Sequence, residues 1–181
     1  MKKIYKKINI IILLAITFIS CEKEDNIFEI KGENNYSYNQ SLNTWHQLKS
    51  SHENSYTYET STGSWAGYGS ATTLEIENGI IISRTYQRYQ IDTSNGDKIN
   101  IDSYTETTED LGSHDYGASL LTIDEIYDIC AEEYLTVDKK SNTIYFETTE
   151  NGILELCGYV PNNCMDDCFT GVRISAFNWK D

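Results

Sequence analysis

Proline and basic residues are both scarce in this sequence. Pro161 is the single proline among 181 residues, and 14 Lys and Arg stand against 28 Asp and Glu, which gives a net charge of −14. So acidic a chain lacks the basic surface that nucleic-acid binding requires, and we expect no nucleic-acid partner. The scarcity of proline, together with 14 tyrosines, is typical of a β-rich exported protein.

Signatures of catalysis are also missing. The sequence contains no Gly-x-Ser-x-Gly, no His-Glu-x-x-His and no glycine-rich phosphate loop. Of its three histidines, only His114, beside Asp115 in a polar loop, could provide acid–base chemistry. Adjacent loop residues generally point apart, so we predict that the protein is not an enzyme. A small hydrolase using His114 and nearby carboxylates is the alternative.

No hydrophobic run is long enough to span a membrane comfortably as a helix. The apolar run at residues 8–19 follows four lysines and has the length of a signal-peptide core rather than of a span of about 20 residues. Ser20-Cys21 then resembles a bacterial lipobox, in which the cysteine is acylated and becomes the mature N-terminus. An ordinary signal peptide followed by an incidental cysteine is the alternative. Residues 1–20 are therefore assigned to a lipoprotein signal peptide.

The residues after Cys21 carry a second signal. Lys23, Glu24 and Asp25 resemble the surface-export tag of Bacteroidota lipoproteins, whereas a merely solvated tether is the alternative. We expect acylated Cys21 to hold the protein in the outer membrane, exposed on the cell surface. Residues 21–39 are predicted to be this anchor and a flexible acidic tether, and residues 40–181 a single domain.

Hydrophobic periodicity predicts an α+β fold, with two helices packed on a mainly antiparallel sheet of about seven strands. The order is one helix, four strands, a second helix and three strands. Asn-Gly at 78–79, 95–96 and 151–152 marks tight turns between strands. The first helix is expected over about 41–51 with Ser41 near its N-cap, and the second begins with the capping box Thr122-Ile123-Asp124-Glu125. The strands are expected at about 54–61, 72–77, 80–91, 98–107, 143–149, 153–160 and 170–179.

Several short motifs in this order resemble an uncharacterised family of small bacterial exported lipoproteins. The motifs are Trp45, Tyr56-Thr57-Tyr58, the hairpin over 74–82, the helix start at 122–125 and the pair Asp166-Asp167. The resemblance covers about 40–179, and that family has no assigned activity.

The best candidates for ligand contact are Trp65 and Tyr68, in a glycine-rich segment between two predicted strands. Exposed aromatic rings suit sugar rings and protein interfaces, whereas packing of these rings into the core is the alternative. Calcium at Asp166-Asp167 is a weaker reading because the regular spacing of a calcium loop is absent. We therefore predict no metal or cofactor, and a protein or a glycan as the partner.

Four cysteines remain after Cys21, and an even number in an exported protein indicates disulfides. Cys130 lies on the apolar side of the second helix, so its partner must lie on the sheet beneath. We expect Cys130–Cys157, with Cys164–Cys168 closing a local turn. The rival pairing is Cys157–Cys168 with Cys130–Cys164. Zinc on three of these cysteines is disfavoured because their spacing does not match the usual metal-binding pairs.

These observations favour a non-enzymatic, surface-displayed lipoprotein that binds a protein or a glycan. A structural subunit of an outer-membrane assembly is the main alternative, ahead of the hydrolase.

The anchor can be tested with Cys21→Ser. The variant should leave the membrane fraction or keep its signal peptide, because no thiol remains to be acylated. Fractionation and intact mass spectrometry measure both outcomes. A processed variant that stays membrane-bound would contradict the lipid anchor. Replacing Lys23, Glu24 and Asp25 with alanine is the companion variant, and it should stay anchored but become less accessible to protease on intact cells.

Overall fold

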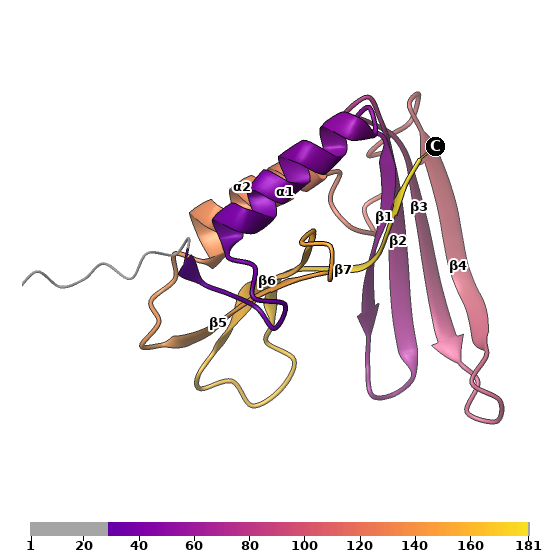
Figure 1. Ribbon diagram of the computed structural model, residues 1–181. Helices are drawn as coiled ribbons and strands as arrows, with labels where there is room; N and C mark the ends of the chain where they lie inside the picture. The colour runs from indigo at the N-terminus through magenta and orange to yellow at the C-terminus, as the bar shows by residue number, and fades with distance from the viewer. Residues whose placement is uncertain (1–28, 181) are drawn as a thin grey trace, which may run out of the picture.

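The computed structural model describes residues 29–180, and its centre is one seven-stranded antiparallel sheet (Figure 1). The strand order is β4-β3-β2-β1-β7-β6-β5, and both helices lie on one side of it. The α+β class with two helices and seven antiparallel strands is thus confirmed. Cys21, Lys23, Glu24 and Asp25 lie outside the described residues. The elements are α1 (Tyr38–Ser51), β1 (Tyr56–Gly63), β2 (Tyr68–Glu77), β3 (Ile80–Ile91), β4 (Lys98–Thr107), α2 (Ile123–Ile129), η2 (Cys130–Tyr134), β5 (Asn142–Thr148), β6 (Leu154–Pro161) and β7 (Thr170–Trp179).

One element departs from the predicted order. The second helix continues directly into η2, a single π-helical turn in which the Leu135 amide donates to the Cys130 carbonyl at 3.0 Å. The wider turn extends the buried stripe of α2 as far as Leu135, which is fully buried.

The hairpin at Asn78-Gly79 has the expected geometry. Asn78 and Gly79 have φ values of 50° and 79°, as a type I′ turn requires, and Ile76 lies opposite Ile81. Local turn chemistry therefore fixes the register of β2 on β3 next to the turn, and a bulge at Glu75/Ile76 shifts the pairing by one residue beyond it.

The start of α1 corrects the prediction for Ser41. The N-cap is Ser37, which forms a capping box with Gln40, so the helix begins three residues earlier than expected. Ser41 lies inside the helix and is fully buried, and its hydroxyl donates to the Gly152 carbonyl at 2.8 Å. The second capping box, Thr122 with Glu125, is present as predicted.

Contact with the folded body also begins before residue 40. Lys31 forms an isolated bridge with Ser37. The Glu33 amide donates to the Glu147 carboxylate at 2.7 Å, and the Asn34 side chain donates to the Thr148 carbonyl at 2.6 Å. Residues 31–37, which fall in the segment predicted as tether, therefore lie against β5.

An aromatic core joins α1 to β1 and β7. The fully buried Trp45 ring stacks on Trp179 at 5.5 Å between centroids and meets Tyr56 and Phe177 edge-on. Such pairs add about 0.5–1.5 kcal/mol each beyond the apolar area that they bury. The tryptophan of the first helix thus fixes α1 over the junction of the two strands.

Two disulfides are present, Cys130–Cys157 and Cys164–Cys168, with Cα–Cα distances of 6.0 Å and 6.1 Å. This is the pairing favoured from the sequence. The first bridge ties the start of η2 to β6 within the core, and the second closes an exposed turn. Because all four sulfurs are bridged, the zinc alternative is wrong.

The two bridges should differ in their contribution to stability. They close sequence separations of 27 and 4 residues, for which the chain-entropy relation gives roughly 3.5 and 2 kcal/mol. Replacing Cys130 and Cys157 with alanine should therefore lower the free energy of unfolding more than replacing Cys164 and Cys168. Urea denaturation of both double variants measures the difference, and equal losses would contradict it.

Candidate functional site

Strand β7 is shared between two halves of the sheet. Its residues 170–173 pair with β6, and its residues 174–179 pair with β1. The β1–β7 pairing ends at Thr60 opposite Ile174, although β1 runs on to Gly63. The two strands therefore diverge beyond this point and leave a gap in the sheet. In Figure 1, β7 crosses from the β6 side to the β1 side of this gap.

The gap opens into a pocket with a volume of about 530 Å³. We call it the fork cleft. Residues of β1, β2, β3 and β7, of the loop before α2, and of α2 and η2 line it. They are Thr60, Ser61, Thr62, Ser70, Thr72, Tyr86, Tyr116, Gly117, Ala118, Ser119, Leu121, Ile126, Tyr134, Phe169, Gly171, Val172 and Arg173.

Hydroxyl groups and aromatic rings dominate this lining. Arg173 is the only charged side chain among the described residues that line the cleft. Its guanidinium lies 5.9 Å from the centre of the Phe169 ring, within the range of a cation–π contact. A site of this kind can hold a polar ligand by hydrogen bonds, stack an apolar group, and attract one negative charge.

A pair of glycines positions the Phe169 wall. Gly158 and Gly171 lie opposite each other in β6 and β7. A Cβ built on either would approach the Phe169 ring to 2.5 Å and 2.8 Å and a neighbouring carbonyl even more closely. The ring can occupy this position only because neither residue has a side chain.

A buried ion pair positions the opposite wall of the cleft, which is the loop that carries Tyr116. Glu106 of β4 is fully buried and accepts hydrogen bonds from Arg84 Nε at 2.9 Å and Nη2 at 2.8 Å. The backbone amides of Gly112 and His114 each donate to the same carboxylate at 2.8 Å. We call these four residues the Glu106 cluster. Arg84 also donates to the Ala118 carbonyl at 3.1 Å, so the cluster fastens the loop that carries Tyr116 to the sheet.

Close packing against the sheet completes this wall. The Ala118 amide donates to Thr72 Oγ1 at 3.0 Å, and the Tyr104 hydroxyl donates to the Tyr116 carbonyl. Gly117 has a φ of 99°, and a Cβ built on it would lie only 2.8 Å from the Tyr104 hydroxyl oxygen. The loop therefore lies directly on the sheet face, and Tyr116 remains exposed at the cleft rim.

The electrostatics of Glu106 follow from its donors. Hydrogen bonds from the Arg84 guanidinium, helped by the Gly112 and His114 amides, lower the pKa of Glu106 far below its ordinary value of 4.5. The carboxylate therefore stays ionised and paired through the physiological range.

The structure places His114 with Glu106, not with Asp115. His114 Nδ1 lies 3.0 Å from Glu106 Oε1 and 3.1 Å from Ser113 Oγ, and the ring stacks on Tyr104. A nucleophile and its orienting acid must contact opposite nitrogens of the imidazole, whereas here both contact the same one. The arrangement therefore lacks the geometry of a nucleophilic triad.

The predicted ligand contacts lie near the fork cleft but not in its lining. Trp65, at the tip of the β1–β2 hairpin, is 96% exposed, and Tyr68 is 51% exposed. Tyr68 begins β2 rather than lying in a loop, because β2 starts four residues earlier than expected. Side chains alternate along a strand, so Tyr68 is on the same sheet face as Ser70 and Thr72 of the cleft.

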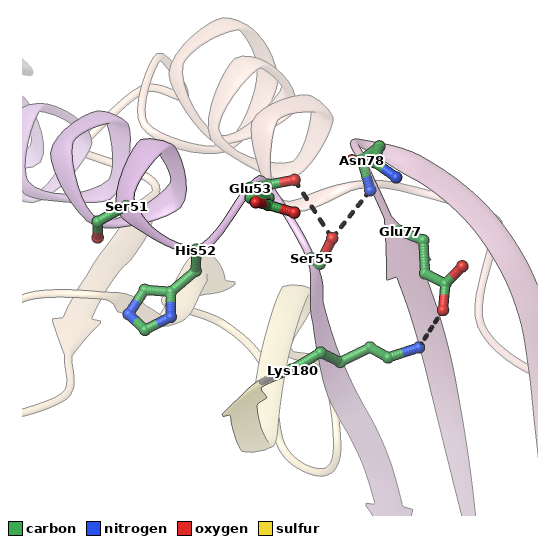
Figure 2. A pocket seen from close by; sticks show the side chains of 7 residues that line it. All are labelled: Ser51, His52, Glu53, Ser55, Glu77, Asn78 and Lys180. Carbon is green, nitrogen blue, oxygen red and sulfur yellow. Dashed lines mark hydrogen bonds and ion pairs between the residues drawn. The ribbon is translucent and has the colours of Figure 1, made fainter.

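Two further pockets are weaker candidates. Figure 2 shows one of about 370 Å³, where Lys180 is ion-paired with Glu77, and also with Glu75, and where the His52 ring stacks on Trp179. The ammonium group of Lys180 in this pocket is therefore already paired with two carboxylates. The other, of about 450 Å³, lies on the opposite side of β7, between residues 174–179 and the β5–β6 hairpin.

Comparisons with known proteins give no match: neither protein-family models, nor curated proteins, nor solved structures resemble this chain significantly. The resemblance to exported lipoproteins therefore stays a hypothesis. Within residues 29–180, neither helix is long and apolar enough to cross a membrane. The same residues contain no group of three or more His, Cys, Asp or Glu side chains that could hold a metal ion.

Sequence reasoning missed the fork cleft and the Glu106 cluster. The Asn78-Gly79 turn sets the register of β3 only as far as Ile76 and Ile81, because a bulge at Glu75/Ile76 shifts the pairing by one residue. The bulge is what brings Arg84 opposite Leu74, an apolar residue on the buried face. An arginine on a buried face needs an acidic partner, but the turn alone does not reveal that Arg84 lies there.

The Glu106 cluster predicts a specific pH dependence. A carboxylate whose pKa is lowered by folding stabilises the protein fully above its ordinary pKa and loses this effect as pH falls toward the folded value. Glu106→Gln should therefore lower the melting temperature at pH 7, and its deficit relative to wild type should shrink below about pH 4.5. Glu109→Gln, on an exposed turn, is the matched control. Thermal melts from pH 3 to pH 7 measure this, and a deficit that does not change with pH would contradict it.

Proposed function

We propose that this protein is a bacterial lipoprotein, anchored through Cys21 on the outer membrane and displayed at the cell surface, whose body is a non-enzymatic binding module. The observation that carries the proposal is the fork cleft, which combines hydroxyl donors, aromatic rings and a single cation in one concave site. Concave sites with a few convergent polar groups and apolar walls are the usual places where proteins bind ligands. The partner is a protein or a glycan.

A binding role fits the cleft better than catalysis. No carboxylate and no histidine is among the described residues that line it. His114, whose ring lies 3.0 Å from Glu106, belongs to the Glu106 cluster, where its contacts fasten a loop. His46 lies 3.9 Å from Asp124, and neither of these two residues lines the cleft. The hydrolase alternative therefore lacks both an acid and a base in the fork cleft.

The hairpin tip extends the binding surface. Trp65 projects fully into solvent, and Tyr68 continues the face of β2 on which the cleft opens. Large exposed aromatic side chains are typical of contact sites for sugars and proteins. We assign Trp65 and Tyr68 to the periphery of the site.

Exposed side chains away from the cleft favour a second candidate, a structural subunit of an outer-membrane assembly. Met165, in the turn closed by the Cys164–Cys168 bridge, is 99% exposed. A stable complex recovered from membranes in mild detergent, and lost in Met165→Ser, would favour this candidate.

The binding role is tested with the full chain in mild detergent, immobilised and exposed to oligosaccharide and peptide panels. Tyr116→Ala should weaken binding about tenfold, since a stacking contact contributes on the order of 1–2 kcal/mol. Tyr145→Ala, which removes a partly exposed tyrosine from β5, is the matched control and should bind as wild type. Trp65→Ala with Tyr68→Ala should weaken binding while changing stability by less than about 1 kcal/mol.

Two outcomes would contradict the proposal. One is the absence of any binding that Tyr116→Ala weakens. The other is turnover of a panel member that His114→Ala abolishes, which would instead favour the hydrolase.

A further inference from the structure

The fork cleft exposes backbone as well as side chains. Beyond Thr60, residues 61–63 of β1 pair only with β2, and residues 170–173 of β7 pair only with β6. Within the described part of the chain, no strand pairs with the two edges that face each other across the cleft. Unpaired strand edges present rows of N–H and C=O groups that can accept a further strand.

The cleft has room for such a strand. Its volume of about 530 Å³ lies within the range of about 300–1,000 Å³ typical of ligand sites. At Gly63, the last residue of β1, a built Cβ meets no heavy atom within 4 Å, so the sheet face is open there.

The two sides of the cleft differ in chemistry. Leu121, Ile126 and Tyr134 belong to the loop before α2 and to the helical layer, so they form an apolar side. Val172 points to the same side, because its cross-strand neighbour Cys157 is bonded to Cys130 of η2. Arg173 follows Val172 in the strand and therefore points to the opposite side, where Phe169 lies.

We infer that the ligand of the fork cleft is an extended polypeptide segment that adds a strand to the free edge of β1, a conclusion that rests on the proposed binding function. Since side chains alternate along a strand, every second residue of the ligand meets the apolar side formed by Leu121, Ile126 and Tyr134. A residue between them presents a carboxylate to Arg173. The backbone of the ligand bonds to residues 61–63, as in other cases of strand addition.

The charges of the cleft and of the whole chain favour a ligand with a single acidic residue. Arg173 is the only cation that lines the cleft within residues 29–180, whereas the chain as a whole has a net charge of −14. A strongly acidic ligand would be repelled by the protein. The expected sequence therefore alternates apolar and neutral or basic residues around a single Glu or Asp.

The experiment uses the full chain in mild detergent and a library of synthetic octapeptides. Their alternate positions are apolar, and one central intervening position is Glu, Gln or Lys. The best binder should weaken at least tenfold when its alternate amides are N-methylated, because strand pairing needs those donors. The backbone amides of Ser61 and Gly63 face the free edge, because Ser64 bonds to β2 and the direction of the amides alternates along the strand. These two amides should become protected from hydrogen exchange when the peptide binds, and those of the exposed β4 edge should not.

Two variants test the side-chain contacts. Arg173→Gln should reduce a preference of about tenfold for Glu over Gln peptides to none, since the variant has no guanidinium to bond to the carboxylate. Arg88→Gln, at an exposed arginine of β3 outside the cleft lining, is the matched control and should keep the preference. Tyr116→Ala should weaken all peptides alike.

Three results would overturn the inference. N-methylated peptides that bind as tightly as their parents would exclude strand addition. Oligosaccharides that bind in a manner sensitive to Tyr116→Ala, with no peptide binding, would sustain the binding function and overturn the peptide ligand. If neither peptides nor oligosaccharides bind, the peptide ligand and the proposed function are both overturned. The same holds if the cleft is protected from hydrogen exchange only by self-association of the chain.

Discussion

Buried tyrosine hydroxyls connect the helical layer to the sheet, and the rest of the structure depends on these bonds. Tyr56 of β1 accepts a hydrogen bond from the Ile123 amide at 3.0 Å, and Tyr58 donates to the Leu121 carbonyl at 2.5 Å. Tyr127 of α2 accepts from the Leu154 amide at 3.1 Å and contacts the Ser41 hydroxyl at 2.6 Å. Each hydroxyl satisfies a group that would otherwise be buried without a partner, which costs about 1–3 kcal/mol.

Burial, rather than these hydrogen bonds, keeps the tyrosines protonated. Burial raises the pKa of Tyr127 and of Tyr38 to about 12, so both hydroxyls remain available as donors through the physiological range. The Tyr38 hydroxyl donates to the Tyr127 carbonyl at 3.0 Å and thereby fixes α1 to α2. These tyrosine hydrogen bonds hold both helices in place on the sheet. The fork cleft lies beside them, where Ile126 of α2 and Tyr134 of η2 form part of its lining.

The division of β7 between two partners creates the cleft. A continuous β1–β7 ladder would close the gap, but a bulge at Glu59/Thr60 ends it, and β6 takes over residues 170–173. The Ser175 hydroxyl donates to the Glu59 carbonyl at 3.2 Å and replaces a backbone bond at the bulge. Bulges of this kind commonly end pairing next to functional sites.

Local features of the fold could be predicted from the sequence, and most long-range ones could not. The Asn78-Gly79 hairpin and the Thr122 capping box each follow from residues with one strongly preferred geometry. The Cys130–Cys157 bridge spans 27 residues, and it was favoured over its rival because Cys130 lies on the apolar side of the second helix. The true N-cap was also readable, because Ser37 and Gln40 form a capping box, yet Ser41 was chosen on helical spacing alone. The start of β2 was missed because Gly67 and Gly69 suggested a loop, although Gly69 is a strand residue covered by the Tyr89 ring.

The candidate site was predicted only at its edge. Trp65 and Tyr68 were identified from exposed-aromatic chemistry, which a short segment reveals. The cleft itself depends on how β7 is shared between β1 and β6, and on Arg84 meeting Glu106 across 22 residues. No local pattern encodes such a division, because it is decided by competition between whole strands for the same partner.

The bulge between β3 and β4 has a consequence for proteins that stand close together on a surface. Strand β4 is an outer edge of the sheet, and its residues Ile99 and Ile101 are 51% and 43% exposed. Strand β4 begins with Lys98, and its pairing with β3 shifts register opposite Arg88 and Tyr89. These two features interrupt an edge that would otherwise be flat, apolar and prone to pair with another strand. Neighbouring copies are thereby discouraged from joining edge to edge, whereas the unpaired edges of the fork cleft are recessed between two strands and a helix. The sheet thus has an interrupted outer edge at β4 and a recessed, unpaired edge at the fork cleft.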